Sequence, residues 1–174
     1  MSRLDSFIRR LQAQRACLDW AIEAIRDLPG PVLEIGLGNG RTYDHVRSRL
    51  GQGRVIWALD RQLAAHPACV PDRDHLILGE FRDTLPALAR RLGLAVALVH
   101  ADTGSGDETA SHAQAQWLAG LVDALLVPGG VVVSDQDMST QGISDRGWRA
   151  EPLPPDVQPG RYFIYRKAAT APGR

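Results

Sequence analysis

The chain has 174 residues, of which 44% are hydrophobic and 23% are charged, and its formal net charge is zero. This length and composition are typical of one globular domain with a sizeable core. Its basic residues, nearly all of them arginine, are scattered along the chain, so the sequence indicates neither a nucleic acid nor a polybasic membrane surface as a partner.

The cysteines and the amino-terminal segment indicate the compartment. Cys17 and Cys69 lie far apart and match neither a metal-ligand spacing nor a disulfide framework, which is typical of free thiols in a reducing compartment. The first turns contain Asp5, Arg9 and Arg10, unlike a signal peptide, and no apolar run is long enough to span a membrane. We therefore expect a cytoplasmic protein.

The first 28 residues are predicted to form a helical cap. Apolar residues recur there at helical spacing, Ser2 and Asp5 suit the start of a helix, and Pro29-Gly30 ends the pattern. This predicts one long amphipathic helix or two shorter ones. The apolar face suits either a cover over a binding site or a contact in a homo-oligomer.

After this cap, short apolar runs alternate with helical patterns. The predicted strands are 32–35, 55–59, 76–78, 96–99 and 131–133, and the predicted helices are 41–50, 84–92 and 109–127. Such alternation predicts a parallel sheet with helices on both faces. A proline-rich segment from Trp148 leads to a last strand at 161–166, which indicates a closing hairpin with an antiparallel strand. We expect one domain over 1–174, with a core at 30–167 and a frayed tail at 168–174.

The most informative segment is Glu34-Ile35-Gly36-Leu37-Gly38-Asn39-Gly40, where a strand meets a helix at three glycines. Glycines bring bare backbone close to a ligand, and the N–H groups of the helix that follows attract an anion. The dinucleotide fingerprint would need its third glycine at position 41, which is Arg41. The chain also lacks a Tyr-x-x-x-Lys pair, since Lys167 is its only lysine, so an NAD(P)-dependent oxidoreductase is the less favoured alternative.

The carboxyl ends of the predicted strands supply the remaining candidates. In an open α/β sheet the ligand lies beyond these ends. Asp60, with Arg61 beside it, ends the second strand and can accept the ribose hydroxyls of an adenosine. Gly79-Glu80-Phe81 suits an adenine edge, because a carboxylate accepts from the exocyclic amine and a ring packs on the base. The fourth and fifth strands end in His100-Ala101-Asp102 and Ser134-Asp135-Gln136-Asp137.

In this order, the features resemble those of the class I S-adenosylmethionine-dependent methyltransferases over about residues 30–167. The resemblance implies a Rossmann-like seven-stranded sheet of order 3-2-1-4-5-7-6, with the last strand reversed and with S-adenosyl-L-methionine as cofactor. The methionine end of the cofactor would then lie at the glycine turn. The positions that correspond to cofactor contacts are Glu34, Gly36, Gly38, Gly40, Asp60, Arg61, Gly79, Glu80, Phe81 and Asp102.

Within that class, the ends of the fourth and fifth strands are similar to small-molecule O-methyltransferases of the catechol and sugar type. Some of these hold magnesium, and the corresponding positions are Asp102, Asp135 and Gln136; Gln136 in place of asparagine departs from the pattern and leaves Mg²⁺ open. The resemblance implies methyl transfer to a small-molecule hydroxyl, with Asp102 as the first candidate for the base, ahead of Asp107, Asp135 and His100. The chain is short and has no sizeable lid insertion, so a non-catalytic S-adenosylmethionine-binding protein is the other alternative.

Overall fold

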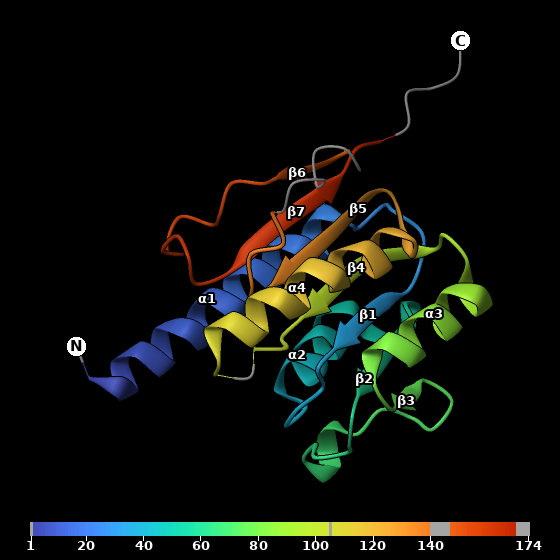
Figure 1. The fold of residues 1–174 in the computed structure, drawn as a ribbon, viewed down its shortest axis with the longest axis horizontal. Helices are drawn as coiled ribbons and strands as arrows, with labels where there is room; N and C mark the ends of the chain where they lie inside the picture. The colour runs from blue at the N-terminus through green and yellow to red at the C-terminus, as the bar shows by residue number, and fades with distance from the viewer. Residues whose placement is uncertain (1, 105, 140–146, 170–174) are drawn as a thin grey trace.

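A seven-stranded sheet lies at the centre of the computed structural model, which describes residues 2–104, 106–139 and 147–169 (Figure 1). Its strand order is β3-β2-β1-β4-β5-β7-β6. The strands are β1 (Val32–Ile35), β2 (Ile56–Asp60), β3 (Leu76–Leu78), β4 (Val96–Ala101), β5 (Leu126–Ser134), β6 (Trp148–Ala150) and β7 (Phe163–Lys167). The first five pair in parallel, and β7 runs antiparallel to both β5 and β6. The predicted fold class and strand order are confirmed.

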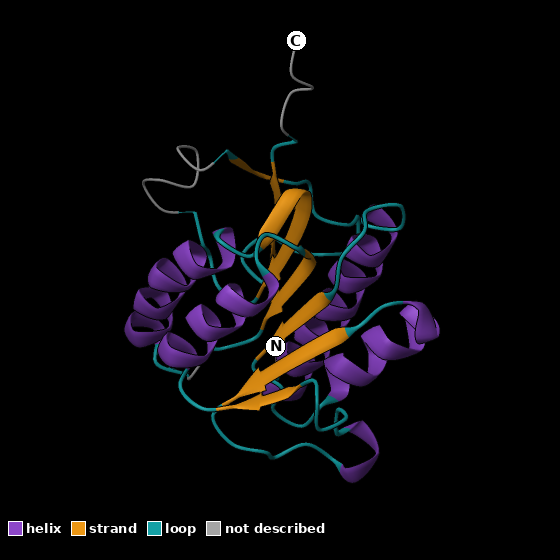
Figure 2. Cartoon of the chain, turned by 90° about the vertical axis from the view of Figure 1, so that its right-hand side faces the viewer, coloured by secondary structure: helices purple, strands orange, loops and turns teal. Residues whose placement is uncertain are grey.

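Helices cover both faces of this sheet (Figure 2). They are α1 (Arg3–Ala24), α2 (Arg41–Leu50), α3 (Phe81–Leu92) and α4 (Glu108–Asp123), with short 3₁₀ helices at Gly51–Gly53 and Pro67–Cys69. Buried side chains of α1 and α2 form one core with the sheet, and those of α3 and α4 form a second core on the opposite face. Two buried faces explain why the central strands are almost continuously apolar.

The amino-terminal segment forms a single helix, α1. Ser2 caps it: the Asp5 amide donates to Ser2 Oγ (3.0 Å), and the Ser2 amide donates to Asp5 Oδ2 (3.0 Å). Its second half is buried against the sheet and α2, whereas residues 2–9 are exposed or half-buried. The first turns of α1 project beyond the ends of the strands (Figure 1). One helix therefore contributes both to the core and to the edge of the sheet where a ligand would lie.

Several predicted boundaries were wrong. Strand β5 spans Leu126–Ser134 rather than 131–133, and β7 spans Phe163–Lys167 rather than 161–166. Helix α3 begins at Phe81 rather than at residue 84, because the Thr84 amide already donates to the carbonyl of the N-cap Glu80 (3.0 Å). Helix α4 ends at Asp123 rather than at residue 127, because Leu126 already pairs with Val96 as part of β5. The register of β4 and β5 then shifts at Pro128, which suits a bulge because proline cannot donate to the ladder.

The remaining expectations concern membrane-spanning helices and the carboxyl-terminal segment. No helix within the described ranges is long and apolar enough to cross a membrane. Of the predicted tail, residues 170–174 lie outside the described residues, and Trp148–Ala150 forms the predicted hairpin with β7.

Candidate functional site

A cavity of about 280 Å³ opens at the carboxyl ends of β1, β2 and β4. Its volume is close to the lower end of the range for small-molecule sites. Its wall is formed by the glycine turn with the start of α2, the end of β2, the end of β4 with the residues that follow it, the start of α3, one face of α1, and Gln114 of α4. The described lining residues are Phe7, Arg10, Leu11, Gln14, Gly36, Leu37, Gly38, Asn39, Arg41, Thr42, Asp60, Arg61, Phe81, Asp102, Thr103, Gly104 and Gln114.

The glycine turn needs its glycines for different reasons. Gly36 has φ +90°, and a Cβ at this position would lie 2.2 Å from the carbonyl oxygen of Asp102. Gly38 has φ +50°, and nothing lies within 4 Å of the place its Cβ would take, so its bare backbone faces open space. Gly40 is the N-cap of α2 and does not line the cavity; a Cβ there would lie 2.6 Å from Cys69 Cβ. Gly36 and Gly38 thus shape the cavity, whereas Gly40 packs behind it.

Asp60 ties the end of β2 to the glycine turn. The Gly38 amide donates to Asp60 Oδ2 (2.8 Å), and the Arg61 amide donates to Asp60 Oδ1 (2.6 Å). The Gln62 amide also donates to Oδ1, at 3.5 Å. A carboxylate oxygen can accept two hydrogen bonds, so Oδ2 can still accept a hydroxyl from a ligand. Both Asp60 and the exposed Arg61 lie on the cavity wall, as expected of residues that would contact an adenosyl group.

Only one of the three residues predicted for the adenine side lies on the cavity wall. The ring of Phe81 lines it, at the first position of α3. Glu80 is the exposed N-cap of that helix, and Gly79, with φ +145°, turns the chain before it. Glu80 and Gly79 are not among the lining residues.

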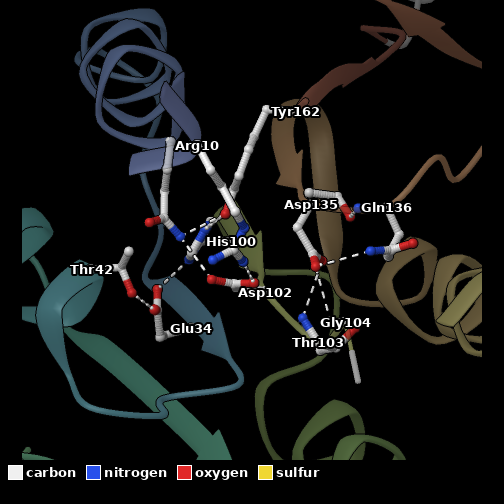
Figure 3. Close-up of polar contacts among 12 residues, drawn as sticks. Arg10, Glu34, Thr42, His100, Asp102, Thr103, Gly104, Asp135, Gln136 and Tyr162 are labelled. Carbon is white, nitrogen blue, oxygen red and sulfur yellow. Dashed lines mark hydrogen bonds and ion pairs between the residues drawn. The ribbon is translucent and has the colours of Figure 1, made fainter. Parts of the chain in front are cut away.

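Glu34 does not line the cavity either, because it belongs to a buried polar network. Its side chain is 1% exposed. Thr42 Oγ1 donates to Glu34 Oε1, and His100 Nδ1 lies 2.8 Å from Glu34 Oε2 (Figure 3). On the other side of the imidazole, Tyr162 Oη lies 3.4 Å from His100 Nε2. Both carboxylate oxygens of Glu34 are therefore engaged within the protein, which leaves this predicted cofactor contact behind the turn rather than in it.

His100 is fully buried at the centre of this network. Burial alone lowers the pKa of its imidazole. The charge of Glu34 and the hydrogen bond to it, together with the charges of Asp102 and Asp135, more than offset that effect, so the pKa is raised. Its contacts with Glu34 and Tyr162 hold the ring in place. Because the side chain is 0% exposed, His100 is poorly placed to take a proton from an acceptor in the cavity.

Asp102 is the candidate base that lines the cavity. Arg10 Nη2 donates to its Oδ1 (2.5 Å), and Gln14 Nε2 donates to its Oδ2 (2.8 Å). Gln14 Nε2 also donates to Tyr162 Oη (2.6 Å), which joins Asp102 to the buried network. The carboxylate is thus held by two side chains of α1, a helix that lies almost ninety residues away along the chain.

The other candidate acids are engaged elsewhere. The amides of Thr103 and Gly104 donate to the two oxygens of Asp135 (3.1 and 3.0 Å), and Gln136 Nε2 donates to Asp135 Oδ2 (3.0 Å; Figure 3). Burial, followed by the charge of Asp102, raises the pKa of Asp135. Asp107 accepts from the Ala110 amide (3.0 Å) as the N-cap of α4.

These contacts do not fit a magnesium site at Asp102, Asp135 and Gln136. Mg²⁺ needs oxygen ligands that converge on one point. Here the amides of Thr103 and Gly104 bind both oxygens of Asp135, and Gln136 turns its amide nitrogen, not its oxygen, toward Asp135. Among the residues that the structure describes, no group of three His, Cys, Asp or Glu side chains could hold a metal ion. We therefore derive no step through a metal.

The sequence predicted the amino-terminal helix as a possible cover over the site, but the residues that α1 contributes to the cavity were not predicted. Phe7, Arg10, Leu11 and Gln14 all line the cavity, and they recur at the spacing of one helical face. The sequence did contain a signal for this, since Arg10 and Gln14 interrupt the apolar pattern one turn apart. That signal could not show which strand end the two polar residues would meet.

Comparison with known proteins identifies the family. The sequence profile of the S-adenosyl-L-methionine methyltransferase family matches residues 1–167. The crystal structure of an S-adenosyl-L-methionine methyl transferase from Silicibacter pomeroyi DSS-3 is 44% identical, covers 97% of this chain and 99% of that chain, and superposes with a TM-score of 0.89. The chain belongs to this family and is an S-adenosylmethionine-dependent methyltransferase. No curated protein matches it at a significant level.

More distant structures share the fold. A cofactor-bound protein from MTB is 18% identical, with 92% of this chain and 81% of that chain covered and a TM-score of 0.59. A candidate O-methyltransferase from Klebsiella pneumoniae is 15% identical, with 91% of this chain and 80% of that chain covered and a TM-score of 0.59. At these identities the likeness concerns the sheet and its helices, not the acceptor.

The family implies S-adenosyl-L-methionine as cofactor, and the cavity has the chemistry to receive it. The wall carries bare glycine backbone at Gly36 and Gly38, a carboxylate at Asp60 and an aromatic ring at Phe81. These suit the amino-acid end, the ribose and the adenine of that molecule, respectively. The start of α2 adds free N–H groups close to the turn.

Proposed function

We propose that this methyltransferase transfers the methyl group of S-adenosylmethionine to the hydroxyl of a small molecule. The observation that carries the proposal is that the glycine turn and Asp102 share one cavity, in which Gly36 lies against the backbone of Asp102. A cofactor bound at the turn would then present its amino-acid end and its sulfonium close to the end of β4. An acceptor in the same cavity would meet the only candidate base that lines it.

Each part of the cavity has a separate task in this proposal. Gly36 and Gly38 let the backbone approach the amino-acid end, Asp60 accepts the ribose hydroxyls, and Arg61 and Phe81 flank the adenosyl group. Glu34 acts from behind: by holding Thr42 and His100 it fixes the strand from which the turn leaves. Gly40, Gly79 and Glu80 set the backbone at the ends of their helices rather than contacting the ligand.

When bound, the cofactor supplies an already activated methyl group for an in-line displacement. The chain therefore needs mainly to align the reacting atoms, at separations of about 3 Å. For a hydroxyl acceptor it must also receive a proton, and Asp102 is the proposed base, because it lines the cavity; Gln14 holds its Oδ2, and its Oδ1 accepts from the half-exposed Arg10. A positioned base of this kind contributes about 10²- to 10⁴-fold to the rate.

The cofactor part of the proposal is tested by calorimetry. We expect the purified protein to bind S-adenosylmethionine and S-adenosylhomocysteine and not to bind NAD. Binding of NAD with neither adenosyl ligand would contradict the proposal and favour the dinucleotide alternative.

The acceptor is tested by transfer of labelled methyl groups. Small catechols, sugars and amines would be screened with and without added magnesium. Labelling of hydroxyl compounds that does not depend on magnesium is the expected result. Labelling of amines only would overturn the hydroxyl assignment. Loss of all labelling on removal of magnesium would overturn the metal-free reading of Asp102 and Asp135.

A further inference from the structure

We propose that Arg10 is a movable ligand of this site: it pairs with Asp102 in the cofactor-free chain and transfers to the carboxylate of bound S-adenosylmethionine, which frees Asp102 Oδ1 for the acceptor. The inference rests on the proposed function, since it takes the glycine turn as the place of the amino-acid end of the cofactor. It adds a cofactor-selecting role for α1 and an order of events, in which the cofactor binds before the base is available.

The guanidinium of Arg10 lies beside the place proposed for the amino-acid end of the cofactor. Arg10 Nη2 lies 2.5 Å from Asp102 Oδ1, and both side chains line the same cavity as the glycine turn. The backbone of Asp102 in turn touches Gly36. A carboxylate bound at the turn would therefore lie close to a guanidinium that already points into the cavity. The planar fork of arginine suits a carboxylate, which it can bind through two N–H groups.

The two side chains that bind Asp102 differ in burial. Gln14 is 5% exposed, and its amide is fixed between Asp102 Oδ2 and Tyr162 Oη. The side chain of Arg10 is 36% exposed and begins where α1 leaves the core, after residues that are exposed or half-buried. The hydrogen bond from Gln14 to Oδ2 is therefore fixed. The contact of Arg10 with Oδ1 can open while Gln14 keeps Asp102 in position.

The ion pair between Arg10 and Asp102 costs little free energy to break. A partly exposed ion pair contributes little to stability, because solvent screens it and two long side chains must be ordered. A ligand that offers Arg10 a second carboxylate needs only a modest advantage to take it. Asp102 and the cofactor carboxylate thus compete for the guanidinium of Arg10. A change that weakens the binding of Arg10 to Asp102 therefore strengthens its binding to the cofactor.

The experiment measures the affinity of the full chain for S-adenosylhomocysteine by calorimetry. The Arg10→Gln variant should bind about tenfold more weakly, because it loses one charge-assisted contact to the ligand. The Asp102→Asn variant should bind about two- to fivefold more tightly, because Arg10 is then free before the ligand arrives. Unchanged affinity in Arg10→Gln would overturn the inference. So would weaker binding in Asp102→Asn, since Asp102 would then be a cofactor ligand and not a competitor.

Controls separate this inference from the proposed function. Methylthioadenosine lacks the amino-acid end, so its affinity should not change in either variant; an equal loss for both ligands in Arg10→Gln would overturn the inference. Arg9→Gln, next to Arg10 and exposed, should bind like the wild type. If Arg41→Gln, and not Arg10→Gln, loses affinity, the carboxylate lies at the start of α2 and the inference is wrong while the proposed function stands. If the wild type binds no adenosyl ligand, the proposed function itself fails.

Discussion

The two acids of the cavity, Asp60 and Asp102, are held in different ways. Asp60 is fixed by backbone amides of its own neighbourhood, Gly38 and Arg61, across adjacent strands. Asp102 is fixed by side chains of Arg10 and Gln14, which come from a helix at the other end of the chain. The first arrangement follows from the strand-turn-helix unit itself. The second exists only because α1 packs across the edge of the sheet.

This difference separates binding from chemistry. Backbone amides cannot leave Asp60, so that half of the cavity is preformed for the adenosyl group. Side chains can leave Asp102, so the other half can change when ligands arrive. Behind both halves, Glu34 and His100 form a buried hydrogen-bonded pair that does not line the cavity and that is an ion pair when His100 is protonated. We therefore expect substitutions at Asp60, Asp102 and Glu34 to affect cofactor binding, methyl transfer and stability, respectively.

The largest expected effect is on turnover in Asp102→Asn. With an acceptor found in the screen, the rate of methyl transfer should fall about 10²- to 10⁴-fold, because the amide cannot take the hydroxyl proton. Affinity for the cofactor should not fall, since Asp60 and the turn are intact. Single-turnover kinetics alongside calorimetry would measure both. A parallel loss of rate and of cofactor affinity would remove the distinction between the two acids.

The next effect is on stability in Glu34→Ala. Removing one partner of a buried pair leaves the other uncompensated, so the free energy of unfolding should fall by about 3–5 kcal/mol. The matched control is Glu23→Ala on the outer face of α1, whose partner Arg26 is equally exposed, and which should cost less than about 1 kcal/mol. Urea denaturation gives both values. Equal losses in the two variants would show that the buried network contributes no more than a surface pair.

A smaller effect is expected on cofactor affinity in Asp60→Ala. The variant loses the ribose acceptor and frees the Gly38 amide, so affinity for S-adenosylhomocysteine should fall about 10- to 100-fold. Calorimetry measures it, and Asp74→Ala on the exposed loop before β3 is the control. Wild-type affinity in Asp60→Ala would mean that the adenosyl group lies elsewhere.

The smallest effect is a pH dependence of stability. The raised pKa of His100 means that, above its ordinary value of 6.5, the folded chain binds more protons than the unfolded chain. The stabilisation is therefore fully present below pH 6.5 and is lost as the pH rises through the raised pKa. In Glu34→Gln the charge that raises this pKa is gone. The difference in unfolding free energy between wild type and this variant should shrink as the pH rises above 6.5 and through the raised pKa of His100. A constant difference would show that the charge of Glu34 does not raise the pKa of His100.

Much of the fold and half of the site follow from the sequence alone. Glycines spaced two apart after a short apolar strand define the turn, because only they permit positive φ and close approach at Gly36. The parallel strands predict which acids meet at one edge, and Asp60 and Asp102 both line the cavity. These features are local or depend on the alternation of strands and helices. Residues close together in the sequence determine both, so the sequence predicts them.

Only the tertiary structure decided the partners of those acids. Nothing near Glu34 in the chain indicates that His100 would bind it, and nothing near Asp102 indicates Arg10 or Gln14. The contacts of Asp102 depend on how α1 lies across the sheet, which is set by the packing of Cys17 and neighbouring residues in the core rather than by the polar groups themselves. The contact between Glu34 and His100 depends instead on the pairing of β1 with β4, in which these two residues are opposite each other. Long-range pairs of charges leave no local pattern, because their spacing in the sequence has no relation to their distance in space. The sequence therefore predicted the glycine turn, and only the tertiary structure showed that Arg10 binds Asp102.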